Sequence, residues 1–140
     1  MSHTTAAIIA GAGLGNRLGA NLPKALLQID GISLVERAFT SLSSVVDEIV
    51  ITAPNGYESE FKKIVGDSAK VITGGVLRSD SVRLALDFLS PSVQFVLVHD
   101  AARGLATPEV ARRVLDTLKA GESAVIPVLP VIDKIGRAHV

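Results

Sequence analysis

The sequence predicts an α/β protein built on a doubly wound, mostly parallel sheet. Short apolar runs rich in valine, isoleucine and alanine alternate along the chain with segments of helical spacing. The composition is 48% hydrophobic but only 4% aromatic, which is typical of strands buried on both faces by helices. At 140 residues, the chain has the length of one domain.

Five apolar runs are expected to form strands, at 6–10, 48–52, 70–73, 95–98 and 124–128. Between them lie helical patterns at 34–42, 58–65 and 78–89, and a last one that begins at 107–109. Ser33 and Thr107 stand where they could cap the first and last helices. In the helix over 78–89, the spacing of Val82, Leu86 and Leu89 predicts a common buried face. This repeated strand–helix order predicts an open sheet whose ligands bind at the carboxyl ends of its strands.

Composition and charge exclude several classes of function. The 14 basic and 14 acidic residues give a formal net charge of zero, which disfavours a nucleic-acid polymer as partner. The absence of cysteine excludes disulfides, thiol catalysis and cysteine-ligated metal. No apolar run approaches the roughly 18 residues of a membrane span, and the start lacks the basic region of a signal peptide. We therefore expect a cytoplasmic protein without a membrane partner.

A glycine-rich loop follows the first expected strand and ends at Pro23-Lys24. Glycine lacks Cβ, so backbone N–H groups can approach and surround a phosphate. Arg17 and Lys24 add the positive charge that a triphosphate needs. The backbone expected to hold the nucleotide comprises Ala10, Gly11, Ala12, Gly13, Leu14 and Gly15.

Two other phosphate-binding loops are less consistent with these residues. A Walker loop ends in Gly-Lys-Ser/Thr, whereas Lys24 lies between Pro23 and Ala25. A dinucleotide fingerprint runs from G-x-G-x-x-G into a helix, but this loop reads G-x-G-x-G and Pro23 interrupts a helix there. Asp30 stands near the position of the acid that would bind the ribose, so a nicotinamide cofactor stays open as an alternative.

Three motifs together carry a resemblance to a known family. The first is G-x-G-x-R followed by x5-P-K in the glycine-rich loop; the second is GGVLRSDSV at 74–82; the third is VHDAAR at 98–103. In this order they resemble the 2-C-methyl-D-erythritol 4-phosphate cytidylyltransferases over residues 6–133. The resemblance implies a Rossmann-like nucleotidyltransferase fold, truncated at its C-terminus. It also implies transfer of CMP from CTP to 2-C-methyl-D-erythritol 4-phosphate, with release of pyrophosphate, in non-mevalonate isoprenoid synthesis.

The same resemblance assigns roles to single residues. Arg17 and Lys24 would be catalytic, because they would hold the triphosphate and stabilise the charge that develops on it. Gly75 and Ser81 would bind the nucleotide by recognising its cytosine base.

The third motif supplies the metal and substrate ligands implied by the family. Asp100 would bind Mg²⁺ or another divalent cation, and Arg103 would face the substrate phosphate. An Asp100–Arg103 salt bridge is the alternative. His99 is expected to be structural, and the role of Arg78 stays open.

Other functions share part of this pattern. A cytidylyltransferase acting on ribitol phosphate or another polyol phosphate has the same motifs, and a molybdenum-cofactor guanylyltransferase shares the first loop. A non-catalytic nucleotide-binding module is the alternative from another class. The expected partners are CTP and a polyol phosphate, and the intact parent protein is expected to be a homodimer.

The C-terminus departs from the family pattern. Lys134 stands where the family has a threonine that contacts substrate, and the residues IGRAHV at 135–140 match what a common short-read sequencing adapter would encode. We therefore expect 1–133 to be the nucleotide-binding part of a single domain and 134–140 to be a non-native tail. Such a fragment is expected to be inactive and to leave apolar surface and a sheet edge exposed.

Overall fold

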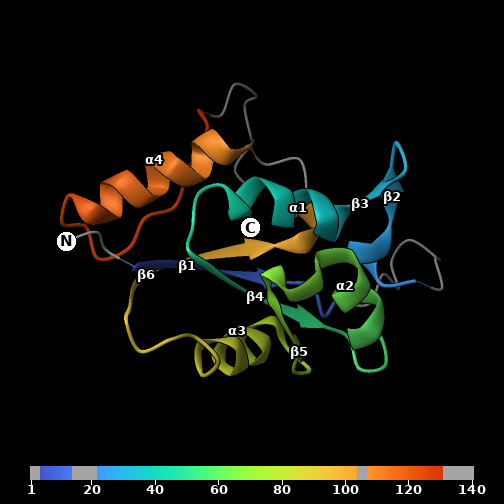
Figure 1. Ribbon diagram of the computed structural model, residues 1–140. Coiled ribbons are helices and arrows are strands. Elements are labelled where there is room, and N and C mark those ends of the chain that lie inside the picture. Colours follow the sequence, from blue (N-terminus) through green and yellow to red (C-terminus); the bar gives the residue numbers. More distant parts are fainter. Residues whose placement is uncertain (1–3, 14–21, 104–106, 131–140) are drawn as a thin grey trace, which may run out of the picture.

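The computed structural model describes residues 4–13, 22–103 and 107–130 (Figure 1). Three residues of the expected nucleotide site, Leu14, Gly15 and Arg17, lie outside the described residues, as does the expected tail at 134–140. The other expected site residues are all described.

The main sheet has four parallel strands in the order β5-β4-β1-β6. Its strands are β1 (Thr4–Ala10), β4 (Glu48–Ala53), β5 (Lys70–Thr73) and β6 (Val93–Asp100). The helices are α1 (Leu34–Ser43), α2 (Glu58–Val65), α3 (Arg78–Leu86) and α4 (Pro108–Lys119), with short 3₁₀ turns η2 (Lys24–Leu26), η3 (Gly66–Ser68) and η4 (Ala101–Arg103). This confirms the predicted Rossmann-like α/β fold, with four of the five expected strands.

Helices cover both faces of the sheet, and the two layers differ in size. Helices α1, α2 and α4 lie on one face and α3 lies on the other (Figure 1). Alternate residues of β1 serve the two layers, because neighbouring side chains of a strand point to opposite faces. Ala7 and Ile9 join the large cluster, whereas Ile8 packs with Val50 and Ala85 on the α3 side.

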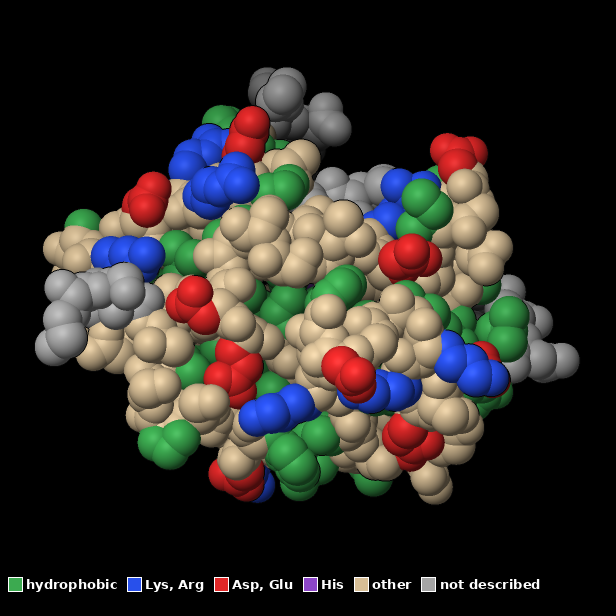
Figure 2. All heavy atoms as spheres, viewed as in Figure 1, with side chains coloured by type: hydrophobic (Ala, Val, Ile, Leu, Met, Phe, Trp, Pro, Cys, Tyr) green, Lys and Arg blue, Asp and Glu red, His purple; other side chains and the backbone are tan. Residues whose placement is uncertain are grey.

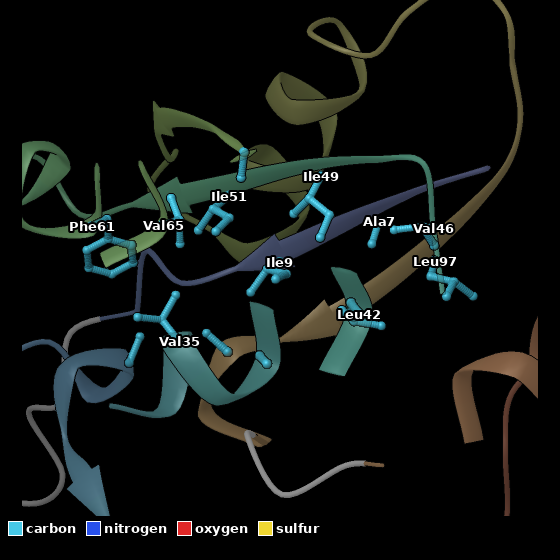
Figure 3. Packing of buried hydrophobic residues seen from close by; sticks show 14 of the residues in the cluster. Ala7, Ile9, Val35, Leu42, Val46, Ile49, Ile51, Phe61, Val65 and Leu97 are labelled. Atoms are coloured by element: carbon cyan, nitrogen blue, oxygen red, sulfur yellow. The ribbon is translucent and has the colours of Figure 1, made fainter. Parts of the chain in front are cut away.

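The large cluster connects α1 and α2 to the strands that carry the site. Figure 3 shows Phe61 of α2 and Val35 of α1 directed toward Ile9 of β1 and Ile51 of β4. All four side chains are fully buried. The central strands β1 and β4 are therefore held firmly at the ends where the glycine-rich loop begins.

The helix boundaries follow local signals, with two corrections. Ser33 caps α1 as predicted, since its Oγ accepts a hydrogen bond from the Glu36 N–H at 3.3 Å. Thr107 was expected to cap α4, but among the described residues its side chain makes no capping hydrogen bond.

The predicted common face of α3 is wrong at Leu86: Val82 and Leu89 pack on the sheet, but Leu86 is exposed. The buried residues of α3 are Ser81 and Ala85, and Leu86 lies about 100° around the helix from Ala85, which places it outside the buried face.

A small hairpin removes the basis for the nicotinamide alternative. Strands β2 (Gln28–Ile29) and β3 (Ile32–Ser33) pair antiparallel around Asp30 and Gly31. Both turn residues have positive φ, 53° and 78°, as a two-residue hairpin with an Asp-Gly turn requires. Asp30 therefore forms a turn and does not follow a strand of the main sheet, where an acid that binds ribose would lie.

The predicted strand at 124–128 is wrong. Residues 122–130 have no regular secondary structure and pair with no described strand. Pro127 and Pro130 lack the N–H group that a ladder needs, so the segment cannot donate at those two positions. Ile126 and Leu129 are consequently exposed.

On the face shown in Figure 2, acidic and basic side chains are interspersed and form no large patch of one sign. Among the described residues, no helix is both long and apolar enough to cross a membrane.

Candidate functional site

A cavity of about 400 Å³ lies at the carboxyl ends of β1 and β6, beside the start of α3. All three sequence motifs contribute to its lining. The expected site residues that line it are Ala10, Gly11, Ala12, Gly13, Lys24, Gly75, Ser81, Asp100 and Arg103. Every described residue of the predicted site therefore reaches the same cavity, as expected where the strands of a parallel sheet end together.

The glycine-rich loop is tied to β4 at its first glycine. The N–H of Gly11 donates to the carbonyl oxygen of Thr52 at 3.0 Å and to its Oγ1 at 3.2 Å. A Cβ at Gly11 would lie 2.8 Å from Phe61 Cε2 and 2.8 Å from the Thr52 oxygen. Glycine is thus needed here for close packing, and Thr52 is a supporting residue that sequence reasoning missed. The one sequence signal for it was a threonine near the end of an apolar strand, and the structure buries that residue completely.

The second motif packs directly against the first. Gly74 donates its N–H to the carbonyl of Ala53 at 2.9 Å, and a Cβ at Gly74 would lie 2.3 Å from the Cβ of Ala12. The two glycine-containing loops therefore share one contact that admits no side chain. A shift of either loop would displace the other.

Ser81 supports the second loop from inside. Ser81 is only 2% exposed, and its Oγ accepts a hydrogen bond from the N–H of Gly75 at 3.0 Å. This bond fixes the direction of the Gly75 backbone, whose own groups line the cavity. Recognition of a base by Ser81 stays a prediction; the observed contact is the one that holds Gly75.

Asp100 ends β6 beside the last residue of β1, because the register pairs Ala10 with Asp100. Its Oδ1 lies 2.6 Å from Nε of Arg78, and its Oδ2 lies 3.9 Å from Nε of Arg103. The predicted Asp100–Arg103 pair is thus present but long, and the shorter pair is with Arg78. The sequence left the role of Arg78 open.

Among the described residues, the lining is cationic and carries one carboxylate. Lys24, Arg78 and Arg103 face it together with Asp100, so an anionic ligand is favoured. In the part of the chain that the structure describes, no group of three or more His, Cys, Asp or Glu side chains could hold a metal. Mg²⁺ commonly uses one or two carboxylates together with phosphate oxygens. Asp100 fits that pattern for a cation that arrives with a phosphorylated ligand.

His99 supports the turn that carries Arg103. Its Nε2 lies 3.1 Å from the carbonyl oxygen of Arg103. Burial lowers the pKa of His99, and the hydrogen bond to Arg103 and the charge of Asp100 oppose that shift only in part. The neutral imidazole therefore donates from Nε2 to the carbonyl, in line with the expected structural role.

Lys24 is placed by the turn that follows Pro23. The N–H of Leu26 donates to the Pro23 carbonyl at 2.9 Å, and Ala25 is buried beneath the turn. Lys24 therefore lines the same cavity as the backbone of 10–13.

Comparison with protein families gives a match over nearly the whole chain. The model of the 2-C-methyl-D-erythritol 4-phosphate cytidylyltransferase family matches residues 5–140. Two curated proteins of that name are similar to the chain. The one from Rhodococcus jostii is 40% identical over 131 residues, which cover 92% of this chain and 58% of that protein. The one from Frankia casuarinae is 42% identical over 136 residues, 96% of this chain and 51% of that protein.

A solved structure agrees with these matches. The crystal structure of 2-C-methyl-D-erythritol 4-phosphate cytidylyltransferase from Thermus thermophilus superposes with a TM-score of 0.75 at 30% identity. It covers 96% of this chain and 58% of that one. The chain thus spans about half the length of the curated relatives it matches.

Proposed function

Because the chain belongs to the 2-C-methyl-D-erythritol 4-phosphate cytidylyltransferase family, we propose that it is the nucleotide-binding part of an enzyme that transfers CMP from CTP to 2-C-methyl-D-erythritol 4-phosphate. In this reaction a phosphate oxygen of the polyol attacks the α-phosphorus of CTP. A new P–O bond forms while the bond to the leaving pyrophosphate breaks.

One observation carries the proposal: a cationic cavity at the strand ends gathers every described residue of the predicted site, with all three motifs represented. Phosphoryl transfer of this kind needs positioning and stabilisation of charge more than covalent help from the protein. The cavity supplies positive charge from Lys24, Arg78 and Arg103, and it supplies positioning through the backbone of two glycine-containing loops.

The roles follow the positions of the residues. Lys24 and the backbone of 10–13 would hold the triphosphate, and the Gly75 backbone, braced by Ser81, would receive the base. Arg103 would meet the polyol phosphate. Arg17, outside the described residues, remains a predicted catalytic partner of Lys24.

A divalent cation fits the lining at Asp100, which would hold it together with phosphate oxygens of the nucleotide. When bound, it would supply positive charge to the triphosphate. Mg²⁺ is the cation we propose, by its preference for few protein ligands.

A second function is favoured by the length of the chain. Since it spans about half of its relatives, we propose that these 140 residues bind CTP but do not turn it over. The nucleotide half of the reaction would then be separable from the polyol half.

The test is CTP binding to the 140-residue chain, measured by isothermal titration with Mg²⁺ present. We expect Lys24→Ala to weaken CTP by roughly 10- to 100-fold, the usual worth of a charge-assisted hydrogen bond. Lys62→Ala is the matched control, because Lys62 pairs with Asp67 away from the cavity. Equal binding of CTP and GTP, or no CTP binding, would contradict the proposal.

The polyol is tested in a chain extended to the full length of the relatives. We expect release of pyrophosphate with 2-C-methyl-D-erythritol 4-phosphate and at most slow release with ribitol phosphate. The reverse preference would favour the other polyol-phosphate cytidylyltransferases.

A further inference from the structure

The shortest ion pair at the cavity joins two different motifs. Nε of Arg78, the first residue of α3, lies 2.6 Å from Oδ1 of Asp100, the last residue of β6. The start of α3 is held in place because Asp80 accepts a hydrogen bond from the N–H of Leu77 at 3.3 Å. Arg78 therefore reaches across the cavity from a fixed helix terminus.

This pair uses the carboxylate that the proposed cation needs. A guanidinium and a divalent cation at the same carboxylate lie only a few ångströms apart, so their positive charges repel each other. Among the described residues, a second guanidinium, that of Arg103, lies 3.9 Å from Oδ2 and adds to the positive charge around this carboxylate. Binding of a cation at Asp100 thus competes with Arg78.

We propose that Arg78 is a positioning residue that exchanges partners during nucleotide binding. Without ligand it holds the Asp100 carboxylate at the cavity. When the cation arrives with the triphosphate, Asp100 turns to the cation and the freed guanidinium binds a phosphate oxygen of the nucleotide. The inference rests on the proposed function, because it takes the nucleotide and the cation from there.

The charges and exposure of the pair suit such an exchange. Side chains of Arg78 and Asp100 are 58% and 32% exposed, and pairs this open to water are weak. Ligand binding can therefore break the pair at little cost. The guanidinium gains a strong acceptor in exchange, since arginine–phosphate bonds are charge-assisted and can be bidentate.

The exchange predicts opposite effects of one substitution. Arg78→Ala removes the competitor of the cation, so we expect Mn²⁺ alone to bind the 140-residue chain about two- to fivefold more tightly, the worth of an exposed ion pair. The same variant loses a phosphate ligand, so CTP at saturating Mn²⁺ should bind roughly tenfold more weakly. Arg78→Lys, which keeps the charge, should recover part of the CTP affinity.

Mn²⁺ binding is measured by electron paramagnetic resonance of the free ion, and CTP binding by titration calorimetry. Arg83→Ala is the matched control: Arg83 lies on the same helix, is exposed and does not line the cavity. It should change neither affinity. Thermal melts show whether each variant is folded at the temperature of the measurement.

The outcomes separate the exchange from the proposed function. If Arg78→Ala weakens both Mn²⁺ and CTP, or changes neither, Arg78 only braces the site and the exchange is wrong. Unchanged Mn²⁺ binding in Asp100→Asn would also overturn it, because the cation would then bind elsewhere. Failure of the unsubstituted chain to bind CTP would overturn the proposed function and the exchange with it.

Discussion

Two regions of the molecule, the cavity loops and the terminal segment, differ in what orders them. We use "cavity loops" for 10–13, 74–81 and 100–103, and "terminal segment" for 122–130. Each cavity loop continues a paired strand or a helix and makes backbone hydrogen bonds to a neighbour. The terminal segment is more apolar, yet Ile126, Val128 and Leu129 are 81%, 83% and 88% exposed.

The difference teaches that apolar sequence alone does not make a strand. A strand needs a neighbour with free N–H and C=O groups in register and a layer to cover its side chains. The cavity loops at 10–13 and 74–81 begin with small residues, yet they have hydrogen-bond partners on β4, and Phe61 of α2 covers Gly11. The terminal segment has two prolines and no described partner strand.

The largest expected effect is at the aromatic side chain beneath the first cavity loop. Phe61 is fully buried, and its Cε2 lies only 2.8 Å from the position that a Cβ of Gly11 would occupy. We expect Phe61→Ala to lower the free energy of unfolding by about 3–5 kcal/mol, the usual cost of truncating a buried phenylalanine. Urea denaturation followed by circular dichroism measures it. A loss below about 1 kcal/mol would mean that the loop does not depend on this packing.

The second effect tests the contact between the two glycine-containing loops. A Cβ at Gly74 would meet Ala12, Ser81 and Thr52, whereas a Cβ at Gly13 meets no described atom within 4 Å. Gly74→Ala should therefore destabilise the chain by about 1–3 kcal/mol through overpacking and weaken CTP binding. Gly13→Ala is the control for stability. Similar melting temperatures of the two variants would show that the loops are not in contact.

The third effect concerns the hydroxyl that holds Gly75. Ser81→Ala leaves the N–H of Gly75 without its acceptor, which should cost about 1 kcal/mol of stability. Because Gly75 lines the cavity, CTP affinity should fall as well. Ser79→Ala, at an exposed position of the same helix, should change neither quantity. Wild-type CTP affinity in Ser81→Ala would show that the bond does not support the site.

The smallest effect is expected in the terminal segment. Leu129→Ser removes an apolar side chain that is 88% exposed, so the free energy of unfolding should change by less than about 0.5 kcal/mol. Light scattering at high protein concentration should decrease, because exposed apolar surface promotes association. A large loss of stability would mean that this segment packs on the domain in solution and would remove the contrast with the cavity loops.

Much of the fold was predictable because its signals are local. Apolar runs identified β1, β4, β5 and β6, and Ser33 marked the start of α1, since strand periodicity and capping depend on neighbours in sequence. The position of the cavity also followed, because parallel strands connected by helices end at one edge. The three motifs could therefore be assigned to one site before any contact was known.

The hydrogen-bond and ion-pair partners within that site were decided by tertiary structure. Thr52 supports Gly11 from another strand, Ser81 turns inward to Gly75, and Arg78 outcompetes Arg103 for Asp100. Each of these three contacts depends on strand register or on the position of a helix terminus. The order of residues in the sequence shows neither the register nor that position.

The sequence by itself thus determined the order of strands and helices along the chain, the class of fold and which of the described site residues meet at the cavity. Tertiary structure decided which groups pair there and that 122–130 forms no strand. The physical reason is the range of the interactions: periodicity, caps and turns act within a few residues, whereas a ladder or an ion pair needs a partner that only the folded chain brings within reach.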